Sequence, residues 1–555
     1  MSTAAGTHDP SPSSSSSPAS MPPPPLFRIL KSAASSVANG SGTVAVAAEE
    51  SLGKSAVPRL GTLTIPGRNS VATPAFFPVT SRGAVPHVTP DNAARTGLVN
   101  GAYFALEDFV ENIPLHPGRV PPIYSTPTSD SSSSASSPTS RLHNFTALPP
   151  SSISVLAPRR HPAAASHLGN GPSHISIVTS TGFQKLTLNA YHAAIDNLRP
   201  DIAVPMADLT YGNGTVTHMA RASSPTPSTT TTSSAAAYAT VPHPSAKRAY
   251  RMAERTEDWL DQVYRDGVAE NTGAALFAPT LPVPYATQWQ YLNRLAELAG
   301  AGDEDEDVSK NAKPTISGLA VYDVDLMPDL HADYADSLVP LPRLSLHPAV
   351  TPHQILRQVD LGIDVMLLPA VTDASEQGLS YTFSWEATDE GSEEQQRVAQ
   401  DESGARLPLA MDLTDPVFKT DTRPLRLGCP CGACTAHHRA YIHHLLDARE
   451  MLAWTLLQIH NHHVMNELFA GVRKTLGEEG IAGFRRRARQ FQMLYETDIP
   501  VGRATRPRLR GYQVKTEGVV EAPLNKPQWG RLEEVTPGAP VPEVKPAVDA
   551  MVVEA

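Results

Sequence analysis

The sequence predicts an α/β protein with a parallel barrel and a small inserted subdomain near its C-terminus. Two observations favour this fold. Short apolar runs alternate many times with stretches of helical periodicity, the pattern of parallel strands joined by helices. In addition, all three cysteines of the chain gather within residues 429–434, outside the alternating region. So many strand-and-helix units favour a closed (β/α)8 barrel, the TIM-barrel architecture, over an open sheet.

The predicted strands are short apolar runs bounded by glycine, proline or polar residues. They begin at Gly61, Thr73, His174, Asp201, Ala274, Ile316, Arg343 and Asp364. Stretches with helical periodicity lie between them and begin at Leu186, Ala246, Gln288 and Pro352. A longer pattern starts at Tyr441 and places apolar residues near the helical period as far as Val472. The segment after the cysteines is therefore predicted to be helical.

The stretch LGCPCGACTAHH, which begins at Leu427, contains Cys429, Cys431 and Cys434. Thiols one or two residues apart rarely reach disulfide geometry, and three thiols cannot pair among themselves. At this spacing the sulfurs can converge on one side of a tight turn, for which the intervening glycine and proline residues suit the backbone. A metal ion explains the cluster better. Zn²⁺ takes four ligands in a tetrahedron, so one further ligand is needed.

Histidine is the usual fourth ligand, and several histidines follow the cysteines. They are His437, His438, His443, His444, His460, His462 and His463. His460 and His463 fall on the apolar stripe of the helical pattern, whereas His462 points away from it. The first two histidines lie too near the turn to close a tetrahedron. We predict one structural Zn²⁺ held by the three cysteines and His460. The alternatives are that His460 is a hydrogen-bonded core residue and that His463 or another neighbour is the ligand.

Tracts rich in serine, threonine and proline interrupt the chain, and such tracts cannot bury a core. We expect a disordered tail over residues 1–25 and a barrel domain over 26–425. A zinc-binding subdomain with C-terminal helices is expected over 426–511, followed by a disordered tail over 512–555. Low-complexity insertions in the barrel are expected at about 126–140, 223–237, 301–313 and 386–405.

The net charge of −11 arises in two segments. Residues 303–307 carry five acids, and residues 386–402 carry seven acids and one arginine, so the two segments contribute −5 and −6. They are typical of solvated insertions, and the remainder of the chain is about neutral. Basic residues gather after the cysteines, among them Arg485, Arg486 and Arg487. These arginines either line an ordinary solvated helix face or bind the phosphates of a nucleic acid.

Membrane and secretory classes are not favoured. No apolar run approaches the roughly 18 residues that span a bilayer. No arginine precedes Arg28, so the N-terminus is a poor presequence or signal peptide. Clustered reduced thiols fit a cytosolic compartment, and we therefore expect a cytoplasmic protein.

In such barrels functional residues lie where the strands end, at the C-terminal face. The corresponding segments are 179–184, 318–323 and 362–369, together with Asp208. An enzyme needs paired carboxylates, or a nucleophile with a base, at these positions. Asp208 and Asp323 are candidates, but an isolated aspartate after a strand more often caps the following helix. The residues alone therefore predict a zinc-bearing barrel without defining a reaction.

Several motifs together resemble the tRNA-guanine transglycosylases. In that family a C-x-C-x2-C motif is followed, 26 residues after its last cysteine, by a histidine in a His-Asn context; that position is His460 here, followed by Asn461. The stretches FRRRARQF, LRPDIAVPMAD, GLAV and LHPAVTPHQILRQVDLGIDV are also similar to the family. The resemblance covers most of residues 27–492 apart from the low-complexity insertions. It implies a TIM barrel with an inserted zinc subdomain.

Catalytic members of this family exchange guanine at the wobble position of certain tRNAs for a 7-deazaguanine such as queuine. The resemblance implies attack on the ribose by an aspartate, with a covalent intermediate as in retaining glycosidases. This chain reads GIDVMLLPAV there, so Leu367 stands at the nucleophile position and the structural Asp364 is retained. Thr179 replaces an aspartate implicated in the chemistry, and Tyr322 replaces a glycine that admits the base. A leucine cannot act as a nucleophile.

A complete zinc set beside a missing nucleophile implies a non-catalytic subunit. By resemblance, such a subunit forms a heterodimer with a separate catalytic subunit and supports exchange of guanine for queuine at position 34. The tRNAs concerned have GUN anticodons (Asp, Asn, His and Tyr), and the exchange belongs to queuosine biosynthesis. The resemblance also implies the cytoplasm, with peripheral association with the mitochondrial outer membrane as an alternative.

The resemblance extends to binding residues. Asp208 matches a base-recognising aspartate, so a vestigial base pocket is expected, with Gly318, Phe183 and Gln184 as its other members. Arg485, Arg486 and Arg487 become the expected contacts to tRNA phosphates.

Two other functions stay open. A divergent transglycosylase active by itself could use Asp364, Asp373 or Asp208 as its nucleophile, although a capping or structural role is the simpler explanation for each. Alternatively, the chain could be a zinc-stabilised RNA-binding scaffold with no link to queuine.

Overall fold

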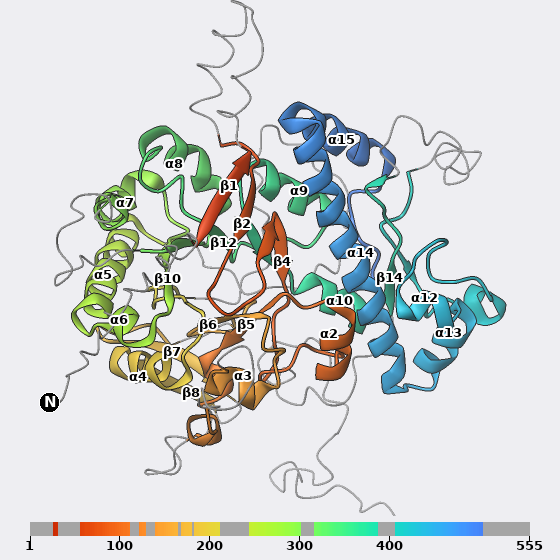
Figure 1. Cartoon of the computed structure of the whole chain (residues 1–555), viewed down its shortest axis with the longest axis horizontal. Coiled ribbons are helices and arrows are strands. Elements are labelled where there is room, and N and C mark those ends of the chain that lie inside the picture. The colour runs from red at the N-terminus through yellow and green to blue at the C-terminus, as the bar shows by residue number, and fades with distance from the viewer. Residues whose placement is uncertain are drawn as a thin grey trace, which may run out of the picture.

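The computed structural model describes residues 26–31, 56–110, 121–128, 139–164, 168–179, 182–210, 244–300, 316–386 and 406–502. The predicted tails, 1–25 and 512–555, lie outside these ranges, as do most residues of the four predicted insertions. The described residues form a barrel and a helical C-terminal part that lies along one side of it (Figure 1).

Eight parallel strands form the barrel. In chain order they are β4 (Ala75–Phe77), β5 (Gly101–Ala105), β6 (Ile153–Ala157), β9 (Ile202–Ala203), β10 (Ala275–Thr280), β11 (Gly318–Val321), β12 (Arg343–Ser345) and β13 (Val365–Leu367). Each strand from β5 onward pairs with the next, and β13 pairs with β4. A parallel bridge from Val79 to Tyr103 joins the extension of β4 to β5 and closes the ring. The predicted (β/α)8 barrel is confirmed.

Two predicted strands lie outside the barrel, and two barrel strands were not predicted. The run from Gly61 forms β2 (Leu60–Leu63), which pairs antiparallel with β1 (Phe27–Lys31) and β3 (Val71–Thr73). The run from His174 forms β7 (His174–Thr179), which pairs antiparallel with β8 (Gly182–Thr187). The strands that the sequence analysis missed are β5 and β6. An apolar run indicates a strand but not its partner, because pairing depends on how the whole chain is routed.

Helices cover the outside of the barrel (Figure 1). They are α2 (Pro90–Thr96), α3 (Arg141–Thr146), α4 (Leu188–Leu198), α5 (Ala246–Arg265), α6 (Val268–Thr272), α7 (Tyr285–Gly300), α8 (Met327–Asp333), α9 (Pro352–Asp360) and α10 (Ala370–Glu376). Short 3-10 turns are η2 (Leu106–Asp108), η3 (Pro122–Ser125), η4 (Val324–Leu326) and η6 (Pro416–Thr420). Local sequence sets several helix starts. At α9, Thr351 and Gln354 form a capping box, which satisfies backbone donors of the first turn.

The barrel interior is apolar and closed at one end. Its lining residues include Ala75, Phe77, Tyr103, Ile153, Val155, Ile202, Val204, Phe277, Ala320, Leu344, Val365 and Leu367. The antiparallel sheet of β1 to β3 adds Leu63, Ile65 and Val71 to the same cluster. Because β3 leads directly into β4, this sheet covers the end of the barrel at which the strands begin. The opposite end, where the strands finish, is the one at which barrels of this class place function.

A buried ion pair stabilises the closed end. Asp364, directly before β13, accepts hydrogen bonds from the Arg59 Nε–H and the Arg343 backbone N–H, both at 2.8 Å. The Arg343 guanidinium donates to His331 Nε2 at 3.1 Å. Burial, together with the positive charges of Arg343 and Arg59, lowers the pKa of His331 to about 3, so its ring stays neutral. Two buried cations therefore depend on one carboxylate.

We expect Asp364→Asn to lower the free energy of unfolding by about 3–5 kcal/mol, because the change leaves two guanidinium groups buried without a counter-charge. Chemical denaturation followed by tryptophan fluorescence measures this loss. Asp325→Asn is the matched control, since Asp325 pairs with Arg357 at the surface and should cost less than about 1 kcal/mol. Equal losses for the two variants would contradict a special role for the buried pair.

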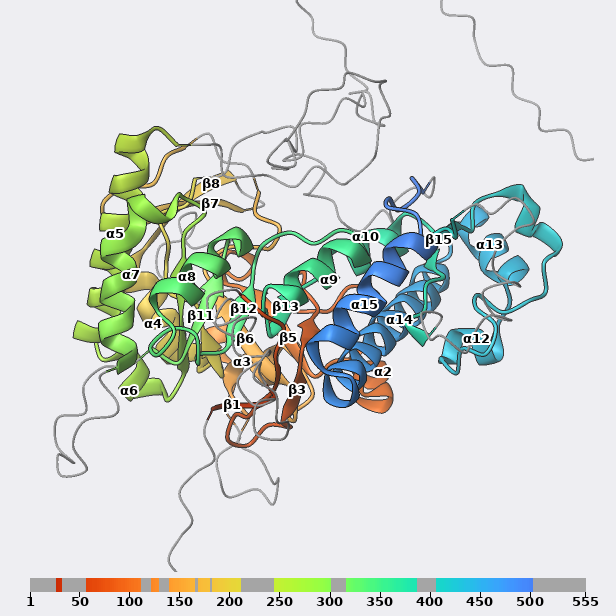
Figure 2. The same cartoon turned by 90° about the horizontal axis from the view of Figure 1, so that it is seen from above.

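The C-terminal part follows β13 and α10. It comprises β14 (Leu379–Tyr381), β15 (Ala410–Asp412), α12 (Gly432–Ala436), α13 (Arg439–Asp447), α14 (Met451–Glu478) and α15 (Gly480–Leu494). The helical pattern predicted from Tyr441 is thus two helices, separated where Arg449 adopts a φ of +59°. α14 runs along the barrel, while α12 and α13 lie at the far end of the long axis (Figure 2). Within the described ranges, no helix is both long enough and apolar enough to cross a membrane.

Candidate metal centre

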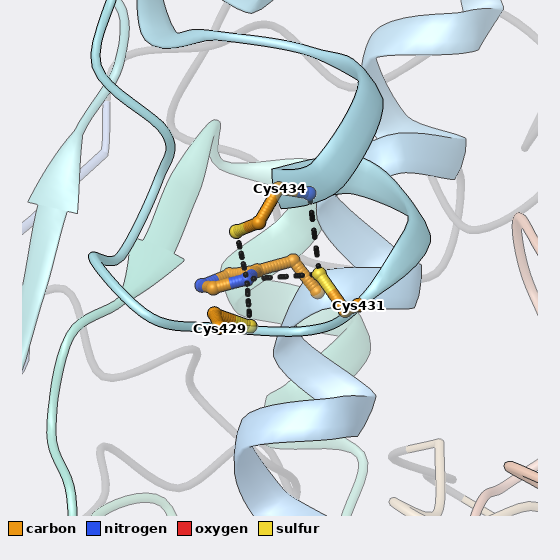
Figure 3. A group of neighbouring side chains, drawn as sticks. Cys429, Cys431 and Cys434 are labelled. Carbon is orange, nitrogen blue, oxygen red and sulfur yellow. Dashed lines mark hydrogen bonds between the residues drawn. The ribbon is translucent and has the colours of Figure 1, made fainter.

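The three cysteines lie in and just before α12. Cys431 is the N-cap of this short helix, and its sulfur accepts a hydrogen bond from the Cys434 backbone N–H at 3.4 Å. Gly428 precedes the first cysteine with a φ of +74°, a conformation that glycine adopts readily. The turn therefore directs all three sulfurs toward one point (Figure 3). This is the convergence that the cysteine spacing predicts.

His460 of α14 completes the group. Its Nδ1 lies 3.7 Å from the sulfur of Cys429, 3.5 Å from that of Cys431 and 3.3 Å from that of Cys434. The four ligand atoms lie within 4.8 Å of one another, and all four residues are buried. In a tetrahedral site with bonds of about 2.3 Å to sulfur and about 2.0 Å to nitrogen, these atoms stand about 3.6 Å apart. The observed separations fit a four-coordinate metal ion.

The orientation of His460 is fixed by a hydrogen bond from the ring nitrogen that does not face the sulfurs. Its Nε2–H donates to the carbonyl of Tyr381 in β14 at 2.9 Å, which leaves the lone pair of Nδ1 directed at the sulfurs. The neighbouring Asn461 accepts from the Tyr381 N–H and donates to Leu379, each at 2.9 Å. The His-Asn pair therefore anchors α14 to β14 while presenting the ligand nitrogen.

The thiols of the cluster interact with one another. Hydrogen bonding with the Cys429 and Cys434 sulfurs, together with burial, raises the pKa of the Cys431 thiol, whereas hydrogen bonding with Cys431 and Cys434 lowers the pKa of Cys429. A bound cation would attract all three thiolates. The donor set of three thiolates and one imidazole is closed and leaves no position for a substrate, which is typical of structural sites.

A charged group surrounds Cys429 on its outer side. Arg426 forms an ion pair with Glu467, and His463 contacts the other oxygen of Glu467 through Nε2 at 2.9 Å. Interactions with Cys429 and Glu467 raise the pKa of His463 to about 9. His463, which the sequence left open as a ligand, therefore lies beside the centre and is not one of the four clustered residues. Sequence reasoning missed Arg426 and Glu467, because they lie on either side of the cysteines with no spacing rule to connect them.

The other nearby histidines have different roles. His462, which the helical phase placed away from the apolar stripe, is instead buried against Phe76, with ring centroids 5.6 Å apart, and burial lowers its pKa to about 4. His438 caps α13 by accepting from the Tyr441 N–H at 3.1 Å, and His437 stacks on the Tyr441 ring. Each has a local structural partner.

We expect His460→Ala to abolish metal binding and to lower the melting temperature, because binding free energy at a structural site contributes to folding. Elemental analysis of the purified protein should give about one metal ion per chain for the unaltered protein and close to none for the variant. His463→Ala, which alters a neighbour of the cluster, should keep the metal. Unchanged metal content in His460→Ala would exclude His460 as a ligand.

At the open end of the barrel, Asp208 is fully engaged. Its Oδ1 accepts from Asn170 and from Arg248, both at 2.8 Å. Its Oδ2 accepts from Arg248 at 2.9 Å and from Arg255 at 2.8 Å. Four charge-assisted or amide donors therefore occupy the carboxylate that the resemblance assigns to base recognition. The 248 and 255 positions are seven residues apart in α5, a spacing that places both on one helix face.

The remaining residues of the predicted base pocket belong to two other elements, β11 and β8. Gly318 is the first residue of β11, and a Cβ added there would lie 2.7 Å from the Phe277 ring. It thus lies at the opposite end of its strand from the mouth. Phe183 and Gln184 belong to β8, where Gln184 donates to the hydroxyl of Thr179 at 3.1 Å. The predicted pocket itself stays a prediction.

Leu367 is the last residue of β13 and pairs with Phe77 of β4. It is 1% exposed and belongs to the apolar interior of the barrel. Thr179, the other residue that replaces a catalytic acid in the resemblance, donates its hydroxyl to the Gly182 carbonyl at 2.9 Å. Aromatic rings lie nearby at the mouth: Tyr103 and His161 are 6.3 Å apart, and burial lowers the pKa of His161 to about 4.

The three arginines predicted to bind phosphate lie on α15 beside acids. Arg485 pairs with Asp360 at 2.7 Å, and Arg486 and Arg487 both pair with Glu479. Their positive charge is therefore partly compensated within the protein. Their contact with tRNA stays a prediction.

Comparison with known proteins agrees with this architecture. A profile of the family described as queuine tRNA-ribosyltransferase matches residues 54–239 and 234–493. A Schizosaccharomyces pombe protein named queuine tRNA-ribosyltransferase accessory subunit 2 is 31% identical over 475 residues, covering 85% of this chain and 89% of that protein. A Culex quinquefasciatus protein of the same name is 26% identical, over 55% of this chain and 62% of that protein.

A bacterial protein from Lachnospira eligens, named queuine tRNA-ribosyltransferase, is 36% identical over 86 residues, which are 16% of this chain and 23% of the relative. Together with the profile match over most of the chain, these similarities place the protein in a known family. The chain belongs to the queuine tRNA-ribosyltransferase family.

Proposed function

We propose that this chain is the non-catalytic subunit of a queuine tRNA-ribosyltransferase. It pairs with a separate catalytic subunit and supports exchange of guanine for queuine at position 34 of tRNAs with GUN anticodons. The name of the S. pombe relative, an accessory subunit that aligns over 85% of the chain, supports this role. The observation that carries the proposal is Leu367, an alkyl side chain sealed in the barrel interior at the position of the family's nucleophile.

The carboxylates that could replace a nucleophile have other partners. Asp364 is fully buried at the closed end and bound by Arg59. Asp208 is fully buried and held by two arginines. Asp373 lies in the first turn of α10, where a carboxylate favours the helix dipole. A carboxylate already bound to a guanidinium is a poor nucleophile, because its charge is shared with that cation. These contacts argue against a transglycosylase that acts alone.

We further propose that the metal is one structural Zn²⁺ per chain, held by Cys429, Cys431, Cys434 and His460. A donor set of three thiolates and one imidazole is among the commonest for structural zinc. When bound, the ion supplies a cross-link between the α12 turn and α14. The chain's own residues complete this link, since Tyr381 orients His460 and Arg426 lies beside Cys429.

The proposed domain division follows from the same contacts. The barrel would end near residue 425 and the zinc-binding subdomain with the C-terminal helices would occupy 426–511. α14 joins the two, because it packs against α10 and β4 as well as against α12. The proposed location is the cytoplasm, supported by reduced clustered thiols; attachment to the mitochondrial outer membrane is the alternative.

Exchange of labelled guanine at position 34 of a GUN-anticodon tRNA tests the proposed function. We expect no exchange by this chain alone, little by the catalytic subunit alone, and at least tenfold more by the mixture. Size-exclusion chromatography of the mixture should show a heterodimer. Exchange by this chain alone would overturn the assignment and return attention to its aspartates.

Binding to tRNAs with other anticodons distinguishes the RNA-binding scaffold. A subunit of this enzyme should stimulate exchange in GUN tRNAs through its partner. A scaffold unrelated to queuine should bind all tRNAs alike and leave exchange by the catalytic subunit unchanged.

A further inference from the structure

α5 and the β7–β8 hairpin lie at the end of the molecule opposite α12 and α13 (Figure 2), and they carry exposed basic and aromatic side chains. On α5, Lys247, Tyr250, Arg251 and Glu254 follow helical spacing and are all exposed. On β8, Phe183 and Lys185 lie two residues apart and are both exposed, so they share one face of the strand. We use the name α5–β8 surface for five of these exposed residues: Lys247, Tyr250, Arg251, Phe183 and Lys185.

The two halves of the surface are held together by polar contacts. The indole N–H of Trp259 in α5 donates to the carbonyl of Pro172, just before β7, at 2.6 Å. Arg255 contacts the carbonyl of Asn170 at 3.5 Å. Burial and the nearby charges of Lys185 and Arg255 lower the pKa of His174, so cations of the hairpin and of α5 both act on this residue. These contacts hold the start of the hairpin against the middle of α5.

The positive charge of this surface is only partly compensated nearby. Lys185, Lys247 and Arg251 have no ion pair among the described residues, whereas the single carboxylate of Asp208 serves both Arg248 and Arg255. Counting these five cations against Asp208, Glu254 and the exposed Asp258 gives a local charge of +2 in a chain of −11. The segment 211–243, which leads into α5, contains one arginine and no acid.

Helix stability does not explain this placement. Cations in the first turns oppose the helix dipole, for which acids are favourable, and the first turn of α5 has no acid. The acids of α5 instead follow these cations along the helix, at Glu254, Glu257, Asp258 and Asp261. The charge order is the reverse of the one that stabilises a helix, so these cations point to an anionic partner.

We propose that the α5–β8 surface binds the phosphate backbone of tRNA, with Phe183 and Tyr250 as faces on which unpaired bases stack. Exposed lysine and arginine side chains contact phosphates, and aromatic rings between them stack on bases without regard to sequence. The inference rests on the proposed function, which makes tRNA the substrate of the complex. It locates the RNA contact beside the barrel mouth, on residues distant in sequence from the arginines of α15.

Fluorescence anisotropy with a labelled GUN-anticodon tRNA tests the surface, using the full chain bound to its catalytic subunit and also the full chain alone. We expect the triple variant Lys185→Ala/Lys247→Ala/Arg251→Ala to weaken tRNA binding at least tenfold at about 0.1 M salt. The slope of log K against log salt concentration should fall by about 2–3, because three phosphate contacts are lost. All three side chains are exposed, so the melting temperature should stay unchanged.

The matched control removes the same charge from exposed arginines elsewhere, in the variant Arg95→Ala/Arg357→Ala/Arg423→Ala. Because acids already pair with these arginines, we expect its tRNA affinity to stay within about threefold of the unaltered protein. Loss of binding in this control with none in the first variant would overturn the proposal. If the melting temperature falls in the first variant, the variant Lys185→Gln/Lys247→Gln/Arg251→Gln, which keeps longer side chains, replaces it. Unweakened tRNA binding by this second variant would also overturn the proposal.

Two further measurements separate this inference from the proposed function. If the unaltered chain and the first variant stimulate guanine exchange equally at limiting tRNA, the proposed tRNA contact of the α5–β8 surface is wrong. The proposed accessory role would still stand. If the unaltered chain gives no stimulation at all, the proposed function fails whatever the surface binds. A third outcome is that the unaltered chain binds vesicles rich in phosphatidylserine, while the first variant keeps its tRNA affinity at every salt concentration. That outcome would identify an anionic membrane as the partner of the surface.

Discussion

The hydrogen bond from His460 Nε2–H to the Tyr381 carbonyl is the interaction on which the C-terminal part of the molecule depends. It leaves the other ring nitrogen, Nδ1, facing the three sulfurs, and so it completes the group of four residues that could hold a metal ion. Asn461 binds the same strand from the next position of the helix. Two adjacent residues thus attach α14 to β14, and the cysteine turn is attached through His460. Since α14 also packs along the barrel, the metal turn and the barrel become parts of one continuous structure.

Leu367 stands where the resemblance places the family's nucleophile, and its side chain adds to the apolar interior of the barrel. Asp364 and Asp208 are both retained as acids, and both are tied to arginines, one at each end of the barrel. The retained carboxylates therefore contribute to stability through buried ion pairs, which are costly to break once one partner is removed.

Net charge and local charge lead to different conclusions about partners. The acidic segments that dominate the total lie mostly outside the described residues, and the arginine-rich stretch of α15 has acids beside it. The cations without an ion pair among the described residues come instead from β8 and α5, and residues 211–243, which lead into α5, contain no acid. A run of arginines in sequence is thus a weaker guide to a binding surface than the ion pairs that each arginine makes.

The sequence by itself predicted the barrel class and the group of three cysteines and His460, and it put Leu367 where the resemblance expects a nucleophile. Those features depend on residue identity at fixed spacings: three thiols in one turn, a histidine in helical phase, alternating strands and helices, and a leucine that cannot attack. Only the tertiary structure decided which strands enter the barrel, that Asp208 is bound by Arg248 and Arg255, and which cations are left without partners. These features depend on contacts between segments far apart in the chain, and local spacing carries no information about such contacts because they arise only when the whole chain has packed.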